Sequence, residues 1–216
     1  NEQKLSQVVR VLLVHAGPEI TRPLERLAAS QVQAASTDPY LLFWLPVLFS
    51  LAPLRGVESM LAVLATLPVE PNGAAVRIIG SLFSDRTDPG MTDWVSKLAP
   101  DHLLQLTLEF HRHVRSEDDL VHNTVYSPGA RDFAETGHRH IFDALMKTSG
   151  QEALSAKLAL AADPLFERLR DRIAALAHER LAAEIDSGAW TPTEVATLLS
   201  RKELSPKTAT DMAQLL

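Results

Sequence analysis

The stretch that decides the fold class is DPLFERLRDRIAALAHERLAAEIDSG, residues 163–188. From Leu165 to Ile185, apolar side chains recur at helical spacing, and arginines and glutamates fill the positions between them. Apolar residues at this spacing lie on one face of an α-helix. Asp163-Pro164 is typical of a helix start, and Ser187-Gly188 is typical of a helix end. The sequence therefore predicts one long amphipathic helix over residues 165–185.

The same pattern recurs along the chain, and sustained alternation of apolar and polar residues, the mark of a half-buried strand, does not occur. Proline and glycine breaks divide the chain into about eleven or twelve expected helices. We expect an all-α fold: an irregular array of helical hairpins with HEAT-like solenoid packing, or a globular bundle. The expected helices cover residues 5–13, 18–32, 40–52, 57–67, 74–83, 92–98, 100–114, 130–147, 152–162, 165–185 and 195–199, with a last helix from 205.

Three segments carry sharper expectations. The segment Tyr40 to Ala52 is apolar on nearly all sides, which predicts a central helix, and Pro46 should kink it or mark a boundary. The preceding helix should bury one side, and the helix over 130–147 should tolerate a glycine. The residues expected on the buried side of that preceding helix are Ile20, Leu24, Leu27 and Val32.

Composition excludes several classes of protein. Hydrophobic residues make up 46% of the chain, so a buried core is expected. Cysteine is absent, which excludes disulfide scaffolds, thiolate catalysis and Cys-ligated zinc. With a formal net charge of -6, the chain has no strong positive potential that would attract nucleic acid or an anionic membrane. No signal-peptide or membrane-spanning pattern occurs, which predicts a cytoplasmic location.

The domain organisation is open. The apolar run at residues 212–216 resembles a helix cut in mid-pattern, which suggests a piece of a larger protein. We expect an N-terminal helical lobe over residues 1–115 and a C-terminal lobe over 116–216, or one continuous domain.

Catalytic motifs are missing from the sequence. It contains no phosphate loop, no GxGxxG, no HExxH and no GxSxG. The acidic run Glu117 to Asp119 is interpreted as a solvated loop. We therefore expect no catalytic residue, no cofactor and no enzymatic activity.

Histidines are the residues with most potential for metal chemistry, because six of the eight fall between residues 102 and 140. Glu135 and His138 form an E-x-x-H pair, but di-iron bundles need a second such motif, which is absent. We expect exposed histidines on polar faces and no metal site. A helical-bundle metal protein stays as an alternative.

Binding of a partner protein is the expected function, since an array of helices offers a large surface. Tyr126, Arg131 and Arg139 are the expected partner contacts. A helix-turn-helix DNA-binding regulator that uses residues 192–216 is the other alternative, with positive charge only at Arg201, Lys202 and Lys207.

The C-terminal third carries a set of spaced leucine, alanine and arginine positions together with Trp190-Thr191-Pro192. These positions are residues 140–145, Gly150, Ala153, Leu154, Leu158, Ala159, Arg172, Ala177, Arg180, residues 190–192 and residues 205–211. In these positions the chain resembles a helical segment of large bacterial STAND-type NTPases of antiviral defence. The resemblance implies a sensor or scaffold role for this chain, without the NTPase motifs.

Overall fold

The computed structural model describes residues 11, 17–34, 40–70, 73–83, 93–114 and 130–199. Within these ranges every regular element is a helix, so the all-α class is confirmed. The elements are α2 (Pro18–Ala34), α3 (Tyr40–Leu51), α4 (Pro53–Leu64), α5 (Ala74–Ser81), η2 (Asp93–Lys97), α6 (Pro100–Val114), α8 (Ala130–Lys147), α9 (Gln151–Ala162), η3 (Pro164–Leu169), α10 (Arg170–Asp186) and α11 (Pro192–Leu199). The two labelled η are short 3₁₀ helices.

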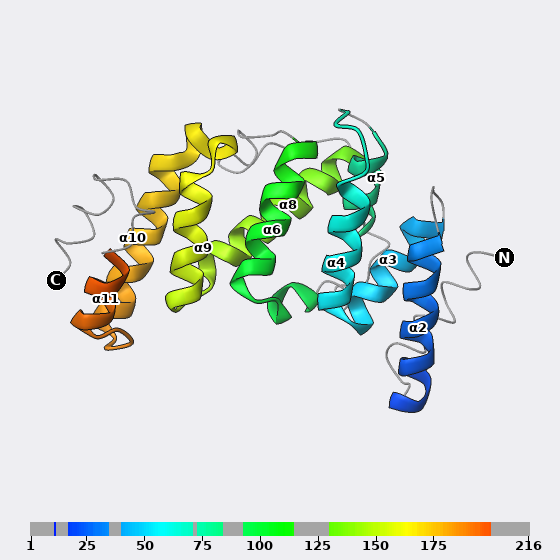
Figure 1. Ribbon diagram of the computed structural model, residues 1–216, viewed down its shortest axis with the longest axis horizontal. Helices are drawn as coiled ribbons and strands as arrows, with labels where there is room; N and C mark the ends of the chain where they lie inside the picture. Colours follow the sequence, from blue (N-terminus) through cyan, green and yellow to red (C-terminus); the bar gives the residue numbers. More distant parts are fainter. Residues whose placement is uncertain are drawn as a thin grey trace.

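The helices form an elongated array, with α2 near one end and α11 near the other (Figure 1). Helix α2 packs on α3 and α3 on α4, whereas α5 and α6 both pack on α8, α6 also contacts α9, and α9 packs on α10. The main group of buried apolar residues runs from Leu24 to Ile173 and so includes residues on both sides of the expected lobe boundary at 115/116. The two-lobe division, the HEAT-like repeat and the number of helices stay predictions. None of the described helices is long and apolar enough to cross a membrane.

Helix α3 lies in the core, as the sequence predicts. Leu41 and the six residues from Trp44 to Phe49 are buried. The helix continues through Pro46, so the expectation of a boundary there is wrong. An internal proline costs about 3 kcal/mol, but burying each large apolar side chain contributes roughly 1.5–3 kcal/mol. The buried side chains of α3 therefore outweigh the missing backbone hydrogen bond.

Helix α2 buries a different face from the one expected. Leu24 and Val32 are buried, but Ile20 and Leu27 are 41% and 45% exposed. Alanines take their place in the interface, since Ala28 continues the spacing of four from Leu24 to Val32. Small side chains allow close packing with α3, a preference that a search for large apolar residues misses.

The expected single helix over residues 165–185 is two helices, so the expectation is wrong at its start. The six residues from Pro164 form η3, and Phe166 has non-helical backbone angles of φ -107° and ψ 20°. The carboxylate of Asp163 accepts a hydrogen bond from the Leu165 N–H at 2.9 Å. This tight turn places the Phe166 ring in the core, 4.2 Å between ring centroids from His111. From Leu169 onward the predicted apolar spacing holds for Leu169, Ile173 and Leu181, which are buried.

Gly137 in α8 allows α5 to approach closely. A Cβ atom at this position would lie 2.1 Å from Cδ2 of Phe83, which follows the end of α5. Two carbon atoms cannot approach to that distance, because their favourable separation is about 3.5–4.0 Å. The glycine that the sequence analysis expected α8 to tolerate is therefore required for this contact.

Candidate functional site

A groove runs between the C-terminal half of α8 and the η3–α10 segment, and we call it the α8–α10 groove. Its volume is about 470 Å³, within the range of roughly 300–1,000 Å³ typical of binding pockets. Each side contributes apolar residues at helical spacing, so the floor consists of two ridges. The floor residues are Phe142, Met146, Leu169, Ile173 and Leu176.

The rim of the groove is charged. Helix α8 contributes Asp143 and Lys147, and α10 contributes Arg172, Glu179 and Arg180. Three cations and two anions therefore surround an apolar floor, in a chain whose formal net charge is -6. Such a surface suits an apolar ligand face flanked by charges of both signs.

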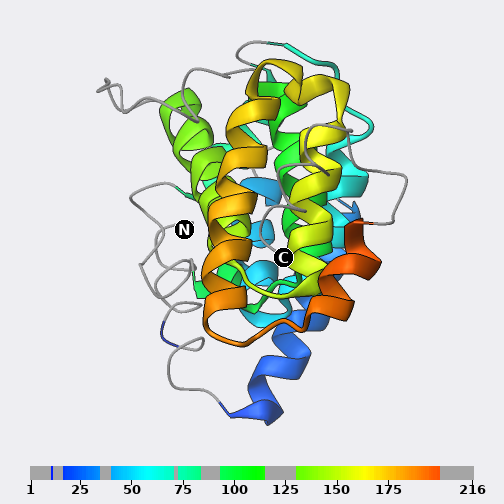
Figure 2. The same ribbon diagram turned by 90° about the vertical axis from the view of Figure 1, so that its left-hand side faces the viewer.

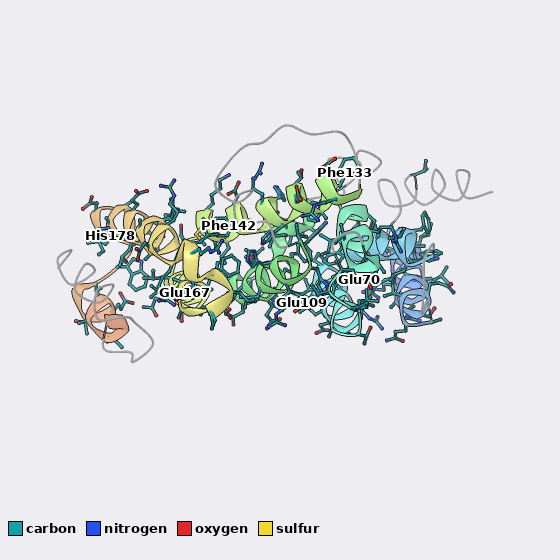
Figure 3. The ribbon with its side chains drawn as sticks, turned by 90° about the horizontal axis from the view of Figure 1, so that it is seen from above. Glu70, Glu109, Phe133, Phe142, Glu167 and His178 are labelled. Carbon is teal, nitrogen blue, oxygen red and sulfur yellow. The ribbon has the colours of Figure 1, made fainter. Side chains whose placement is uncertain are left out.

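The groove exists because α10 packs mainly on α9 and approaches α8 at few points. Figure 2 shows α10 in front, with α8 on one side and α9 on the other. Phe142, labelled in Figure 3, comes from the α8 side of this gap and is 5% exposed.

A buried carboxylate fixes α10 against α9 and the turn before α9. Oε2 of Glu184 accepts hydrogen bonds from Nε1 of Trp190 at 2.7 Å and from the Gly150 N–H at 3.1 Å. Its Oε1 accepts from Nε of Arg180 at 3.2 Å, and Arg180 also donates to the Ser149 hydroxyl. We call these five residues the Glu184 cluster. Because Arg180 also lines the groove rim, the cluster holds one wall of the groove in place.

Two pKa shifts accompany this cluster. Burial alone would raise the pKa of Glu184, but the hydrogen bonds from Trp190 and Gly150 outweigh it, and the pKa lies below its usual value. Lys157 of α9 is 2% exposed, and its Nζ donates to the Thr148 carbonyl at 2.7 Å. Burial lowers the pKa of Lys157 to about 8, although the negative charge of Glu184 counteracts part of this effect.

The buried positions of Glu184 and Lys157 were not predicted from the sequence. Glu184 is one of the glutamates that fill the positions between the apolar residues of 165–185, yet it is 8% exposed. Its spacing from Ala177 and Leu181 places it on the inward face. Lys157 lies in a helix that is otherwise almost entirely alanine and leucine on its buried positions. The sequence does contain a signal for both residues, because helical spacing places each of them among the buried positions of its helix.

Three of the histidines are buried, which corrects the expectation for them that they lie on polar faces, whereas His140 is exposed as expected. His111, His113 and His138 are 4%, 4% and 1% exposed. His111 of α6 and His138 of α8 lie 5.3 Å apart between ring centroids, and the Phe166 ring covers His111. The sequence analysis gave the helical positions but not the contacts between α6, α8 and η3 that bury these rings.

Each buried histidine has a different electrostatic environment. Nε2 of His113 lies 3.3 Å from Oε1 of Glu109, as the spacing of four predicts. His138 has no such anion: burial, the neighbouring His111 and Arg139 lower its pKa to about 3, against a hydrogen bond with the Thr107 backbone that acts in the opposite direction. Its Nε2 atom is buried and has no hydrogen-bond partner among the described residues. His138 is therefore neutral in the folded protein.

Ligands for a metal ion do not come together in the described part of the chain, where no group of three or more histidine, aspartate or glutamate side chains could hold one. The E-x-x-H pair does not form a joint site. Glu135 accepts a hydrogen bond from Nε of Arg131 at 2.6 Å, whereas His138 is directed toward His111.

The expected partner contacts are not brought together with the groove. Tyr126 lies outside the described residues. Arg131, in the first turn of α8, binds Glu135 and donates to the Val114 carbonyl at 3.3 Å, so it links α8 to the end of α6. Arg139 is half-buried two turns further along α8. Their role in binding stays a prediction.

The start of the expected DNA-binding segment is confirmed as a helix. Thr191 and Glu194 form a reciprocal cap at the N-terminus of α11: the Thr191 N–H donates to Oε2 of Glu194 at 2.9 Å, and the Glu194 N–H donates to Oγ1 of Thr191 at 3.3 Å. The second helix of that segment and its basic residues, Arg201, Lys202 and Lys207, lie outside the described residues.

No family model matches the chain, and comparisons with curated proteins and with solved structures found no match.

Proposed function

We propose that this chain is a non-catalytic helical protein-interaction module whose docking site is the α8–α10 groove. The observation that carries the proposal is the groove itself: an apolar floor between two helices with a charged rim. The occupant that fits this shape is an amphipathic helix of a partner protein or of an adjoining domain.

The spacing of the floor residues favours a helix as the occupant. Phe142 and Met146 are separated by one turn on α8, and Leu169, Ile173 and Leu176 continue over two turns from η3 into α10. Two parallel ridges of this kind accept a third helix whose apolar residues recur at intervals of three and four. The charged rim would then contact polar residues on both sides of the apolar stripe.

The wider part of the proposal concerns the parent protein. The resemblance to bacterial STAND-type NTPases of antiviral defence spans residues 140–211, and this range includes both walls of the groove. We propose that the chain is the sensor or scaffold part of such a cytoplasmic protein, excised from its NTPase, and that it has no enzymatic activity of its own. The resemblance supports this role, and the groove supplies the docking site.

The experiment places a photo-crosslinking amino acid at Leu176 in the groove floor, in cells of the source organism. The crosslinked protein is identified, purified and titrated against the chain. Met146→Glu places a charge on the apolar floor, and Leu54→Glu is the matched control, because Leu54 of α4 is exposed and lies outside the groove. Loss of a central apolar anchor costs about 2 kcal/mol or more, which corresponds to roughly a 30-fold weaker Kd.

The proposal predicts that Met146→Glu weakens binding by this factor and that Leu54→Glu does not. Equal affinity of the wild type and the Met146→Glu variant would exclude the groove as the docking site. Catalytic turnover of a substrate by the purified chain would contradict the non-catalytic role.

A further inference from the structure

Three aromatic rings join α6, α8 and η3 beneath one end of the groove, and we call them the histidine joint. They are His111, His138 and Phe166, all 4% exposed or less. The centroid distances are 5.3 Å between the two histidines and 4.2 Å between His111 and Phe166. The joint therefore connects η3, and with it the start of α10, to the α6–α8 pair.

Burial, His111 and Arg139 disfavour a positive charge on His138, and among the groups that act on it only the hydrogen bond with the Thr107 backbone favours one. The charged and titratable groups that act on it are His111 from α6 and Arg139 from α8 itself, and both disfavour protonation. From η3 the facing side chain is the apolar Phe166, through its contact with His111. The Thr107 backbone bonds His138, and no carboxylate of the described residues is among the groups that act on it. Glu109 of α6 is paired with His113.

We propose that the histidine joint is an acid-sensitive attachment: protonation of His138 releases α8 from α6 and η3, so that the joint is closed at neutral pH and opens as the pH falls. A proton placed on His138 would create an imidazolium beside a second imidazole in an apolar cluster. The charge is stable only where water reaches the ring, and water reaches it only when the joint is open. Protonation and opening are therefore linked.

The joint is coupled to the groove through its position. His138 precedes Phe142 by one turn on α8, and Phe166 precedes Leu169 by three residues, so each side of the joint continues directly into a wall of the groove. Opening of the joint would separate these walls and remove the docking site. This consequence rests on the proposed function, whereas the acid sensitivity of the joint does not.

The test is amide hydrogen exchange of the whole chain, without any partner, at pH 7.5 and pH 5.0. Protection factors are corrected for the intrinsic effect of pH. An open state in which His138 titrates normally, near pH 6.5, gains roughly tenfold in population for each pH unit below that value. We expect protection in α8 and η3 to fall by roughly 30-fold at pH 5.0 while α3 and α4 keep theirs. The lower pH of 5.0 lies above the usual pKa of carboxyl groups, so that protonation of acidic residues does not contribute to the loss of protection.

Two variants separate the joint from general acid effects. His138→Gln keeps a hydrogen-bond donor but does not titrate, so protection in α8 and η3 should be the same at both pH values. His140→Gln is the matched control, because His140 is an exposed histidine on the same helix and its loss should leave the 30-fold fall unchanged. If His138→Gln does not fold at pH 7.5, His111→Gln replaces it in the same comparison and should reduce the fall.

Three outcomes would overturn the proposal: unchanged protection of wild-type α8 and η3 at pH 5.0, an equal fall in α3 and α4, or a full 30-fold fall in the non-titrating variant. Because exchange is measured on the free chain, each of these outcomes is independent of whether the groove binds a partner. The titration of the purified partner against the chain, carried out at pH 7.5, tests the groove with the joint closed.

Discussion

Replacement of Glu184 by alanine is the perturbation that tests most directly what holds the C-terminal helices together. The carboxylate accepts hydrogen bonds from Nε1 of Trp190, from the Gly150 N–H and from Nε of Arg180. Removal of the side chain leaves these three donors without their acceptor. It also removes the negative charge that counteracts the desolvation of Lys157.

The magnitude follows from the burial of each donor. Trp190 is 6% exposed, and a buried donor without a partner costs about 1–3 kcal/mol. The Gly150 N–H is part-buried and should contribute about 1 kcal/mol, whereas Arg180 reaches solvent and its pair with Glu184 contributes less than 1 kcal/mol. We therefore expect Glu184→Ala to destabilise the protein by about 3–4 kcal/mol.

The assay is urea unfolding followed by circular dichroism, with Glu179→Ala as the control. Glu179 is an exposed glutamate on the same helix, and its removal should change the free energy of unfolding by no more than about 0.5 kcal/mol. A double-mutant cycle with Trp190→Phe measures the pair directly and should give a coupling energy of about 1–2 kcal/mol. Equal effects of Glu184→Ala and Glu179→Ala, or a coupling energy near zero, would refute the assignment of Glu184 as a buried acceptor.

The pH dependence of the free energy of unfolding tests the role of Glu184 in a second way. The pKa of Glu184 in the folded protein lies below its unfolded value. Its ionised form therefore stabilises the fold at every pH above the unfolded value near 4.5, and this contribution is lost as the pH falls through the folded pKa. The difference in stability between the wild type and Glu184→Gln should shrink across that range.

Three further variants test local features of the fold. Gly137→Ala should destabilise by about 1–3 kcal/mol in urea unfolding, because the clash with Phe83 exceeds the gain of about 1 kcal/mol in helix propensity. Thr191→Ala removes the reciprocal cap with Glu194 and should cost α11 about 1 kcal/mol, seen as faster amide exchange confined to that helix. Phe166→Ala should lower stability by about 3–5 kcal/mol in thermal unfolding, whereas Phe166→Leu should lose far less, because the ring is fully buried.

Helix positions could be predicted from the sequence because helical periodicity is a local property. The predicted range of residues 130–147 coincides with α8, and the helix predicted over residues 195–199 is present, although α11 begins earlier, at Pro192. The predictions are wrong where contacts between helices determine the local backbone geometry or the buried face. Phe166 leaves helical geometry to enter the core, and Ile20 and Leu27 of α2 are exposed because alanines form the contact with α3.

The groove and the histidine joint could not be predicted in this way, since each forms between helices that are distant in the sequence. His111 and His138 are separated by 27 positions, and nothing local indicates that their rings meet. The sequence placed the candidate contacts Arg131 and Arg139 on α8, but the groove near Phe142 forms because α10 packs mainly against α9 and only weakly against α8.

Glu184 and Lys157 lie between these two cases, because each is a charged residue at an inward position of its helix, and helical spacing makes such positions predictable. A lysine at position 157 within a helix of buried alanines and leucines must find an acceptor and a negative charge, since an isolated buried cation is too costly. In the structure its Nζ donates to the Thr148 carbonyl, and the negative charge of Glu184, on the inward face of the next helix, counteracts part of its desolvation. A charged residue on an apolar face therefore predicts an opposite charge on the inward face of the helix packed against it, and with it which faces of α9 and α10 meet. The open side of α10 then follows: the face that does not meet α9 is the one left to form the groove.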